Sequence, residues 1–287
     1  MEGYEAALDV LPERIRRAAL LFGKEEKERI TEFRLRCGEM PAALMPDGEK
    51  CFGTETVRQG DLQRLLEICS GASPYAAAES LRHGYITVRG GVRVGFCGEV
   101  LCESGEVRTI KGFSSAAIRI PREILGCGRG LCRGSFTSTL IISPPGGGKT
   151  TLLRDMIRCL SRDGKRVALC DERGEVAALA GGRSGFDLGP ATDVMSGGRK
   201  SETAIMLLRS MTPDIVAMDE ITAAADIEAC RMLSHCGVRL LATAHAASVE
   251  ELRSRPLYQE LLHQRIFRRA VVIGRMGRER IYREECL

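Results

Sequence analysis

A loop rich in glycine and proline carries the residues of this chain that are best suited to chemistry. It runs from Ser143 to Thr150, reads Ser-Pro-Pro-Gly-Gly-Gly-Lys-Thr, and follows an apolar run over Leu140 to Ile142. A helical pattern begins directly after it. A strand, a glycine loop that closes on Gly-Lys-Thr and a helix, in this order, form the Walker A phosphate-binding loop. The sequence therefore predicts a site for the phosphates of a nucleotide.

Each part of this loop has a role that its residue type can fill. Glycines let backbone N–H groups turn toward the phosphates, and the start of the helix adds the positive end of its dipole. Lys149 would reach the β- and γ-phosphates of ATP, and the Thr150 hydroxyl would hold Mg2+. The expected nucleotide-binding residues are Pro145, Gly146, Gly147, Gly148, Lys149, Thr150 and Thr151.

The loop departs from the usual motif at its first position, where Ser143 replaces glycine and two prolines follow. The prolines stiffen the loop but leave the N–H donors of residues 146–150 in place. The alternative interpretation is a turn rich in glycine and proline that contains an incidental lysine.

Hydrolysis of a nucleotide needs acids near the phosphates, and a second strand supplies two. Four apolar residues at 215–218 predict a buried strand, and Asp219 and Glu220 follow it. Asp219 would order Mg2+ through water, while Glu220 would orient and activate the attacking water. The alternative is that the two acids form a solvated turn.

Polar residues end two further predicted strands. Asp171, Glu172 and Arg173 follow one of them, and Thr243 and His245 lie at the end of the other. Ligands of open α/β sheets bind at the carboxyl ends of the strands. Asp171 and Glu172 could hold the metal or its waters, and His245 could sense the γ-phosphate. The alternatives are an ion-paired turn and a structural histidine.

The elements that must position these residues divide the chain into two domains. We expect a smaller N-terminal α+β domain over 1–125, a linker over 126–135 and an α/β P-loop domain over 136–287. The P-loop domain alternates strands and helices, which predicts a mostly parallel sheet. Its expected strands are 139–143, 166–170, 215–218, 239–243 and 270–273, with a possible edge strand at 278–283; its expected helices are 151–161, 201–210, 224–233 and 249–262.

The N-terminal domain combines helical and strand patterns. The patterns predict one helix or two short ones over 5–21, strands at 30–37 and 42–45, helices over 57–69 and from Ser73, a hairpin at 85–100 and short strands before 121. The stretch 193–200 is expected to be a surface loop, or alternatively a mobile loop or a subunit contact.

Composition restricts the class of protein. The 287 residues carry a net charge of +4 and contain 12 cysteines, none of them in a Cys-x-x-Cys pair. We therefore expect the cysteines to be mostly core residues rather than zinc ligands. No apolar run is long enough to span a bilayer, and the N-terminus shows no export signal, so we expect a cytoplasmic protein.

Taken together, these motifs resemble the secretion superfamily of P-loop ATPases. Asp171, Glu172 and Glu175 match its acidic box, Asp219 and Glu220 its acid-tipped strand, and Thr243-Ala244-His245 the end of its histidine box. The first histidine of that box is absent, since Val238 stands in its place, and so is the tetracysteine zinc module of many members. The resemblance is closer to the stage III sporulation AA family, through residues 118–123, 171–175 and 208–214.

This resemblance implies more than the motifs alone. It implies a RecA-like fold and a Mg2+-dependent ATPase that forms a homo-oligomer, a hexamer in that superfamily. It implies a cytosolic motor beside membrane partners, in the channel complex between mother cell and forespore during endospore formation. Arginines from the N-terminal domain would close over the nucleotide, with Arg119 and Arg122 as first candidates and Arg89 and Arg93 as alternatives.

Two other functions remain open at this point. One is an ATPase stimulated by nucleic acid, which the arginine-rich stretch 265–283 favours. The absence of tryptophan and an aromatic content of 5% leave few platforms for base stacking, so we expect no nucleic-acid partner. The other is a nucleotide switch that does not hydrolyse, against which Glu220 argues.

Overall fold

The computed structural model describes residues 2–71, 81, 84–103, 106–277 and 279–287. The chain divides into two compact units. The first comprises Met1–Arg122 with Ala178–Gly185, and the second comprises Glu123–Ala177 with Phe186–Leu287. The first unit ends a few residues before the expected boundary. Residues 126–135, which we expected to form a linker, belong to the second unit.

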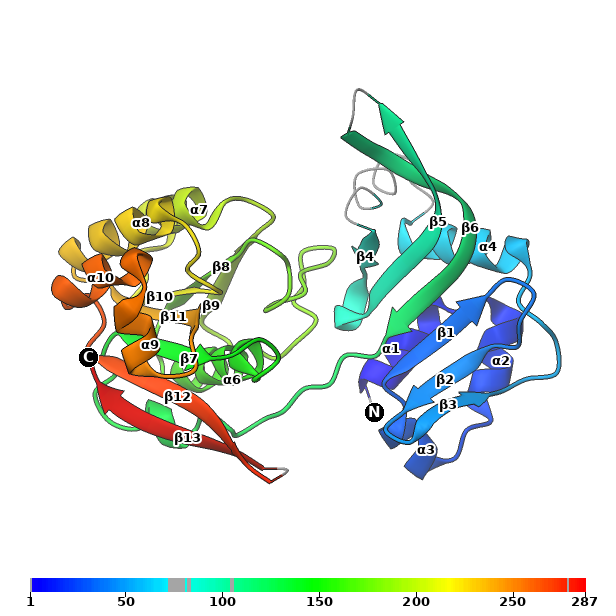
Figure 1. Cartoon of the computed structure of the whole chain (residues 1–287), viewed down its shortest axis with the longest axis horizontal. Coiled ribbons are helices and arrows are strands. Elements are labelled where there is room, and N and C mark those ends of the chain that lie inside the picture. The colour runs from blue at the N-terminus through cyan, green and yellow to red at the C-terminus, as the bar shows by residue number, and fades with distance from the viewer. Residues whose placement is uncertain (1, 72–80, 82–83, 104–105, 278) are drawn as a thin grey trace. The chain divides into compact units, whose positions relative to one another are not determined.

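The first unit is an antiparallel sheet with helices packed against it (Figure 1). Among the described residues, the strand order is β3-β2-β1-β6-β5-β4. The core contains Phe33 and Leu35 of β1, Ile118 of β6 and Leu62 and Leu65 of α4. The elements are α1 (Glu2–Val10), α2 (Glu13–Leu20), α3 (Lys24–Arg29), β1 (Glu32–Arg36), β2 (Ala42–Met45), β3 (Gly48–Cys51), α4 (Gln59–Cys69), β4 (Tyr85–Thr87), β5 (Arg93–Glu103) and β6 (Glu106–Arg119).

The first unit differs in detail from the sequence-based expectation. The first helical pattern forms two helices, because Pro12 ends α1 and caps α2 with an extended backbone. The short elements α3 and β3 were not expected, since α3 buries no residue and all of β3 is exposed. The long strand β6 replaces two short ones. The helix expected from Ser73 begins outside the described residues.

The second unit is built on a mostly parallel sheet whose order is β13-β12-β7-β11-β10-β8-β9 in the described part of the chain. Only the β12–β13 pair among these is antiparallel. The strands are β7 (Thr139–Ser143), β8 (Val167–Asp171), β9 (Thr192–Ser196), β10 (Ile215–Met218), β11 (Arg239–His245), β12 (Arg269–Met276) and β13 (Glu279–Cys286). The helices are α6 (Lys149–Arg162), α7 (Lys200–Met211), α8 (Ala224–His235), α9 (Val249–Ser254) and α10 (Pro256–His263).

Helices cover both faces of this sheet, which explains why its central strands are apolar throughout. Ile141 and Leu241 pack into one core with α6, whereas Leu140, Leu240 and Ala242 pack into another with α7 to α10. Successive side chains of a strand point to opposite faces, so a strand covered on both sides needs apolar residues at every position.

Two details of this unit differ from expectation. The helix expected over 249–262 is split into α9 and α10, because Arg255 precedes Pro256 and has an extended backbone. The first half of the stretch 193–200, expected to be a surface loop, lies in the edge strand β9, which pairs with β8 in parallel.

The strand order determines where the polar residues meet. Strand β11 lies between β7, which leads into the phosphate-binding loop, and β10, which ends before Asp219. All three run parallel, so their carboxyl ends share one edge of the sheet. Thr243 and His245 on β11 therefore lie between the loop and the acids.

Candidate functional site

The glycines of the loop between β7 and α6 are required either by backbone conformation, as at Gly146 (φ 71°) and Gly148, or by lack of space, as at Gly147. Gly148 caps α6 with φ 102°, a left-handed conformation that favours glycine. A Cβ on Gly147 would lie 2.2 Å from Ser143 Oγ and 2.7 Å from Ser143 Cβ. Because Ser143, the residue that departs from the usual motif, fills this space, residue 147 must be glycine.

Lys149 is buried in the loop and is held by neutral groups. Its ammonium donates to the carbonyl oxygens of Ser143 at 2.9 Å and Pro144 at 3.3 Å, and lies 2.7 Å from His245 Nδ1. Burial lowers the pKa of Lys149, and the charges of Glu220 and Asp219 oppose that shift. None of these three contacts is an ion pair, so the ammonium is available to an incoming phosphate.

Two hydroxyl groups fix the carboxylate of Asp219. Thr150 Oγ1 donates to Asp219 Oδ2 at 3.2 Å, and Thr243 Oγ1 donates to Asp219 Oδ1 at 2.8 Å. The same Thr243 hydroxyl accepts the backbone N–H of Glu220 at 2.9 Å. The fully buried Thr243 therefore connects the two acids that follow β10.

The carboxylate of Glu220 lies between two basic side chains. His245 Nε2 is 2.9 Å from Glu220 Oε1, and Arg173 Nη1 is 3.4 Å from Glu220 Oε2. A neutral His245 with its proton on Nε2 satisfies both contacts of the ring, because Nδ1 then accepts from Lys149 and Nε2 donates to Glu220. The ring thus connects Lys149 to the candidate base. Glu220 itself has φ 44°, an uncommon conformation for a residue with a side chain.

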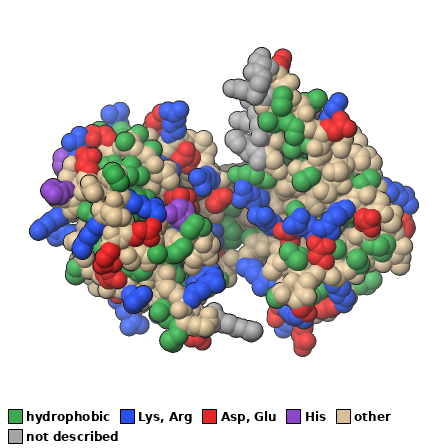
Figure 2. All heavy atoms as spheres, viewed as in Figure 1, with side chains coloured by type: hydrophobic (Ala, Val, Ile, Leu, Met, Phe, Trp, Pro, Cys, Tyr) green, Lys and Arg blue, Asp and Glu red, His purple; other side chains and the backbone are tan. Residues whose placement is uncertain are grey.

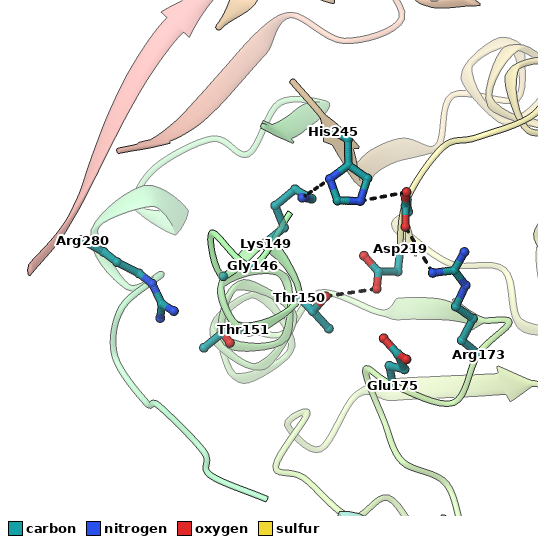
Figure 3. A pocket seen from close by; sticks show the side chains of 11 residues that line it. Gly146, Lys149, Thr150, Thr151, Arg173, Glu175, Asp219, His245 and Arg280 are labelled. Carbon is teal, nitrogen blue, oxygen red and sulfur yellow. Dashed lines mark hydrogen bonds and ion pairs between the residues drawn. The ribbon is translucent and has the colours of Figure 1, made fainter. Parts of the chain in front are cut away.

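These groups line one pocket of about 390 Å³ (Figure 3). It is bounded by the phosphate-binding loop, the start of α6 and the strand ends. The lining residues are Gly146, Gly148, Lys149, Thr150, Thr151, Arg173, Glu175, Asp219, Glu220, His245 and Arg280. The pocket brings together a lysine, a hydroxyl, two carboxylates and a histidine at the edge of the sheet where we expected them.

The two other expected acids occupy different positions. Asp171 is buried, and its carboxylate accepts the backbone N–H groups of residues 175, 176 and 177 at 2.8–3.2 Å. Burial raises the pKa of Asp171, although these N–H groups oppose the shift. Glu172 accepts from Lys200 at 2.8 Å, which lowers the pKa of Glu172. Neither acid lines the nucleotide pocket, so their binding role stays a prediction.

The two candidate arginine fingers lie in the first unit, whose placement relative to the pocket is not defined. Arg119 is exposed, with Nε 3.4 Å from Glu32 Oε2. Arg122 donates from Nη2 to the carbonyl oxygens of Glu28 at 2.6 Å and Ile30 at 3.2 Å. Their proposed role in a neighbouring active site stays a prediction.

Arg280 is the pocket residue that the sequence patterns did not single out. It lies on β13, and a Cβ on Gly148 would be 2.7 Å from its Cζ. It belongs to the arginine-rich stretch that we weighed as support for nucleic-acid binding. No local sequence signal places Arg280 at the pocket, because β13 comes near the P-loop strand β7 only through its pairing with β12.

The described residues contain no preformed cluster of metal ligands and no membrane-spanning helix. No cluster of three or more His, Cys, Asp or Glu side chains in this part of the chain is arranged to hold a metal ion. None of the helices described combines the length and the apolar character that crossing a bilayer requires.

Comparisons with solved structures show a shared fold. The Legionella pneumophila ATPase DotB matches with a TM-score of 0.58 and 15% identity, covering 90% of this chain and 76% of that chain. The pilus retraction motor PilT, solved with bound ADP, matches with a TM-score of 0.62 and 17% identity, covering 92% and 81%. The expected RecA-like P-loop fold is confirmed.

Sequence comparisons define the family. A family model described as "Sporulation stage III, protein AA" matches residues 1–283. Stage III sporulation protein AA of Bacillus subtilis (strain 168) is 35% identical over 277 residues, covering 93% of this chain and 90% of that protein. The resemblance inferred from the motifs is thereby confirmed, and the chain belongs to the sporulation stage III, protein AA family.

Proposed function

We propose that this protein is a Mg2+-dependent ATPase that converts ATP and water to ADP and phosphate. The observation that carries the proposal is the meeting of Lys149, Thr150, Asp219 and Glu220 in one pocket. A lysine and glycine loop for phosphates, a hydroxyl and carboxylate for a metal, and a further carboxylate for water are the parts that phosphoryl transfer to water needs.

The residues of the pocket fit a magnesium ion bound together with ATP. Mg2+ prefers oxygen ligands, keeps several waters and is usually held by one or two protein groups plus the substrate phosphates. Thr150 Oγ1 and Asp219 Oδ2 lie 3.2 Å apart, so both could face one ion. Such a site needs no preformed cluster of acids. The ion would neutralise charge that develops on the phosphates.

The contacts of Lys149 and Glu220 indicate what the protein does when ATP enters. Lys149 would turn from the Ser143 and Pro144 carbonyls and from His245 toward the β- and γ-phosphates. His245 would then keep its contact with Glu220, whose carboxylate would orient the attacking water and accept its proton. His245 lies between both groups, so it is placed to respond to the γ-phosphate.

The family supports a wider role. The Bacillus subtilis relative is a stage III sporulation protein, and the structural neighbours include an ATPase and a pilus retraction motor. We therefore propose a cytoplasmic motor of a membrane secretion or channel complex in endospore formation, acting between mother cell and forespore. It would assemble as a homohexamer beside membrane proteins, with Arg119 or Arg122 reaching the site of a neighbouring subunit.

Steady-state ATP turnover of the full chain tests this proposal. We expect turnover with Mg2+ and none with EDTA, and no stimulation by single-stranded DNA or RNA. On the viewed face of the second unit, Figure 2 shows acidic side chains among the basic ones, so this face offers nucleic acid no broad cationic surface. Strong stimulation by nucleic acid but not by anionic liposomes would favour the alternative, a nucleic-acid-stimulated ATPase.

A further inference from the structure

Besides Lys149 and Arg173, the pocket contains a third cationic side chain, Arg280, on the side away from the catalytic acids. Figure 3 shows Arg280 on the same side of Lys149 as Thr151, while Asp219, His245 and Arg173 lie on the other side. Arg280 is carried by β13, which pairs with β12 in the terminal hairpin. Its guanidinium packs against Gly148, the residue that caps α6.

Arg280 has no acidic partner in the part of the chain that the structure describes. No hydrogen bond or ion pair within those residues involves its guanidinium, and it is half-buried. Its partner across the hairpin is Arg275, a residue of like charge. Directly opposed like charges destabilise a pair of strands, so this position is costly for the free protein. An anion bound between Arg280 and the start of α6 would remove that cost.

The positions of the acids decide which part of a nucleotide this anion would be. The γ-phosphate must lie near Glu220, because the attacking water is held there. The remaining phosphates then extend across the glycine loop, away from Glu220 and toward Thr151. Arg280 lies at this far end, next to the phosphates that ADP and ATP share.

We propose that Arg280 binds the phosphates at the nucleoside end of the nucleotide, so that it recognises ADP and ATP alike. This inference rests on the proposed function of the pocket. Guanidinium groups suit the role because they donate two parallel hydrogen bonds to phosphate oxygens. A contact made equally in the ground state and the transition state changes binding and leaves the chemical step unaltered.

The test measures the dissociation constants for ADP and ATP by calorimetry on the full chain. The constant for ATP is measured in a Glu220→Gln background, so that ATP is not hydrolysed during the titration. In Arg280→Ala we expect both constants to rise by the same factor, about 10- to 100-fold. In Arg280→Lys, which keeps the charge, the rise should be smaller.

Arg283→Ala is the matched control. Arg283 lies three residues further along β13, so it points to the opposite face of the strand, and it is exposed. We expect it to bind both nucleotides normally. The thermal midpoint of each variant without nucleotide shows whether folding has changed.

Two results would overturn the inference. One is normal binding of both nucleotides by Arg280→Ala. The other is a loss confined to ATP, which would place Arg280 at the γ-phosphate. Lys149→Ala distinguishes a failure of this inference from a failure of the proposed function. If Lys149→Ala no longer binds nucleotide while Arg280→Ala still does, only the role of Arg280 is refuted. If Lys149→Ala also binds nucleotide normally, the proposed function of the pocket fails.

Discussion

Substitution of Gly147 by alanine should disrupt the phosphate-binding loop, chiefly through contact with Ser143. The added Cβ would meet Ser143 Oγ at 2.2 Å, Ser143 Cβ at 2.7 Å and the Pro144 carbonyl oxygen at 3.1 Å. Ser143 is fully buried and ends strand β7, so it cannot move away freely. The loop must shift instead, and the N–H groups that face the phosphates shift with it.

The size of the effect follows from the cost of overpacking. An extra methyl in a well-packed site costs about 1–3 kcal/mol. If this cost falls on the binding-competent form of the loop, the dissociation constant of Gly147→Ala for ATP should rise roughly 5- to 150-fold. The thermal midpoint without nucleotide should change little, because the loop can relax when no ligand is bound.

Second substitutions at Ser143 should restore binding in a graded order. Ser143→Ala removes the contact at 2.2 Å but leaves the Cβ contact at 2.7 Å. Ser143→Gly removes both, and of the three nearest contacts the Pro144 oxygen at 3.1 Å remains. Binding by Gly147→Ala should therefore recover slightly with alanine at 143 and largely with glycine, as measured by calorimetry with ADP and ATP.

This reasoning fails if Gly147→Ala binds ATP as tightly as the original protein. It also fails if Ser143→Gly alone weakens binding as much as Gly147→Ala does, or if glycine at 143 gives no more rescue than alanine. The single substitution Ser143→Gly is the necessary control, because it removes the same atoms without the added methyl.

Two further predictions concern catalysis and acid stability. Thr243→Val keeps the shape of Thr243 but leaves the Glu220 N–H and an Asp219 oxygen without their hydrogen-bond partner. Because an unsatisfied buried polar group costs about 1–3 kcal/mol, the turnover number for ATP should fall about 5- to 150-fold. Normal turnover would refute the role of the hydroxyl. Arg166 lowers the pKa of Asp214 from 3.8 to about 2, so the pair stabilises the fold above about pH 4 and loses this contribution as the pH falls toward 2. Asp214→Asn should therefore lower the unfolding free energy by roughly 1 kcal/mol at pH 7, after allowance for screening of this exposed pair, and by less at pH 3. Urea unfolding measures both values, and an equal loss of unfolding free energy at the two pH values would contradict the pairing.

The sequence predicted the fold and the neighbourhood of the site because both depend on local patterns. The buried strands β7 and β10 stand out as apolar runs, and in a parallel sheet the residues after them must meet at one edge. Edge strand β9 was missed because it buries no residue and contains an acid, Asp193, so its sequence resembles that of a loop. Pro256 could have predicted the break between α9 and α10, but the helical spacing of apolar residues on both sides of it favoured one continuous helix.

The contacts within the site could not be predicted in the same way. Asp171 and Asp219 both come directly after an apolar run. Asp171 nevertheless accepts hydrogen bonds from backbone N–H groups, whereas Asp219 accepts one from Thr150. This difference depends on the path of the chain after each strand. Arg280 reaches the pocket only because the terminal hairpin pairs with the P-loop strand β7 through β12, a contact between distant parts of the sequence.

The most direct test of the central claim compares binding and turnover of ATP in Glu220→Gln. This variant keeps the size of the side chain but removes the carboxylate that would accept a proton. We expect it to bind Mg2+ and ATP with nearly the original affinity and to hydrolyse ATP at least about 100-fold more slowly, whereas Lys149→Ala should lose binding. Turnover at the original rate in Glu220→Gln would contradict the assignment of Glu220 as the base and, with it, the proposed mechanism of the pocket.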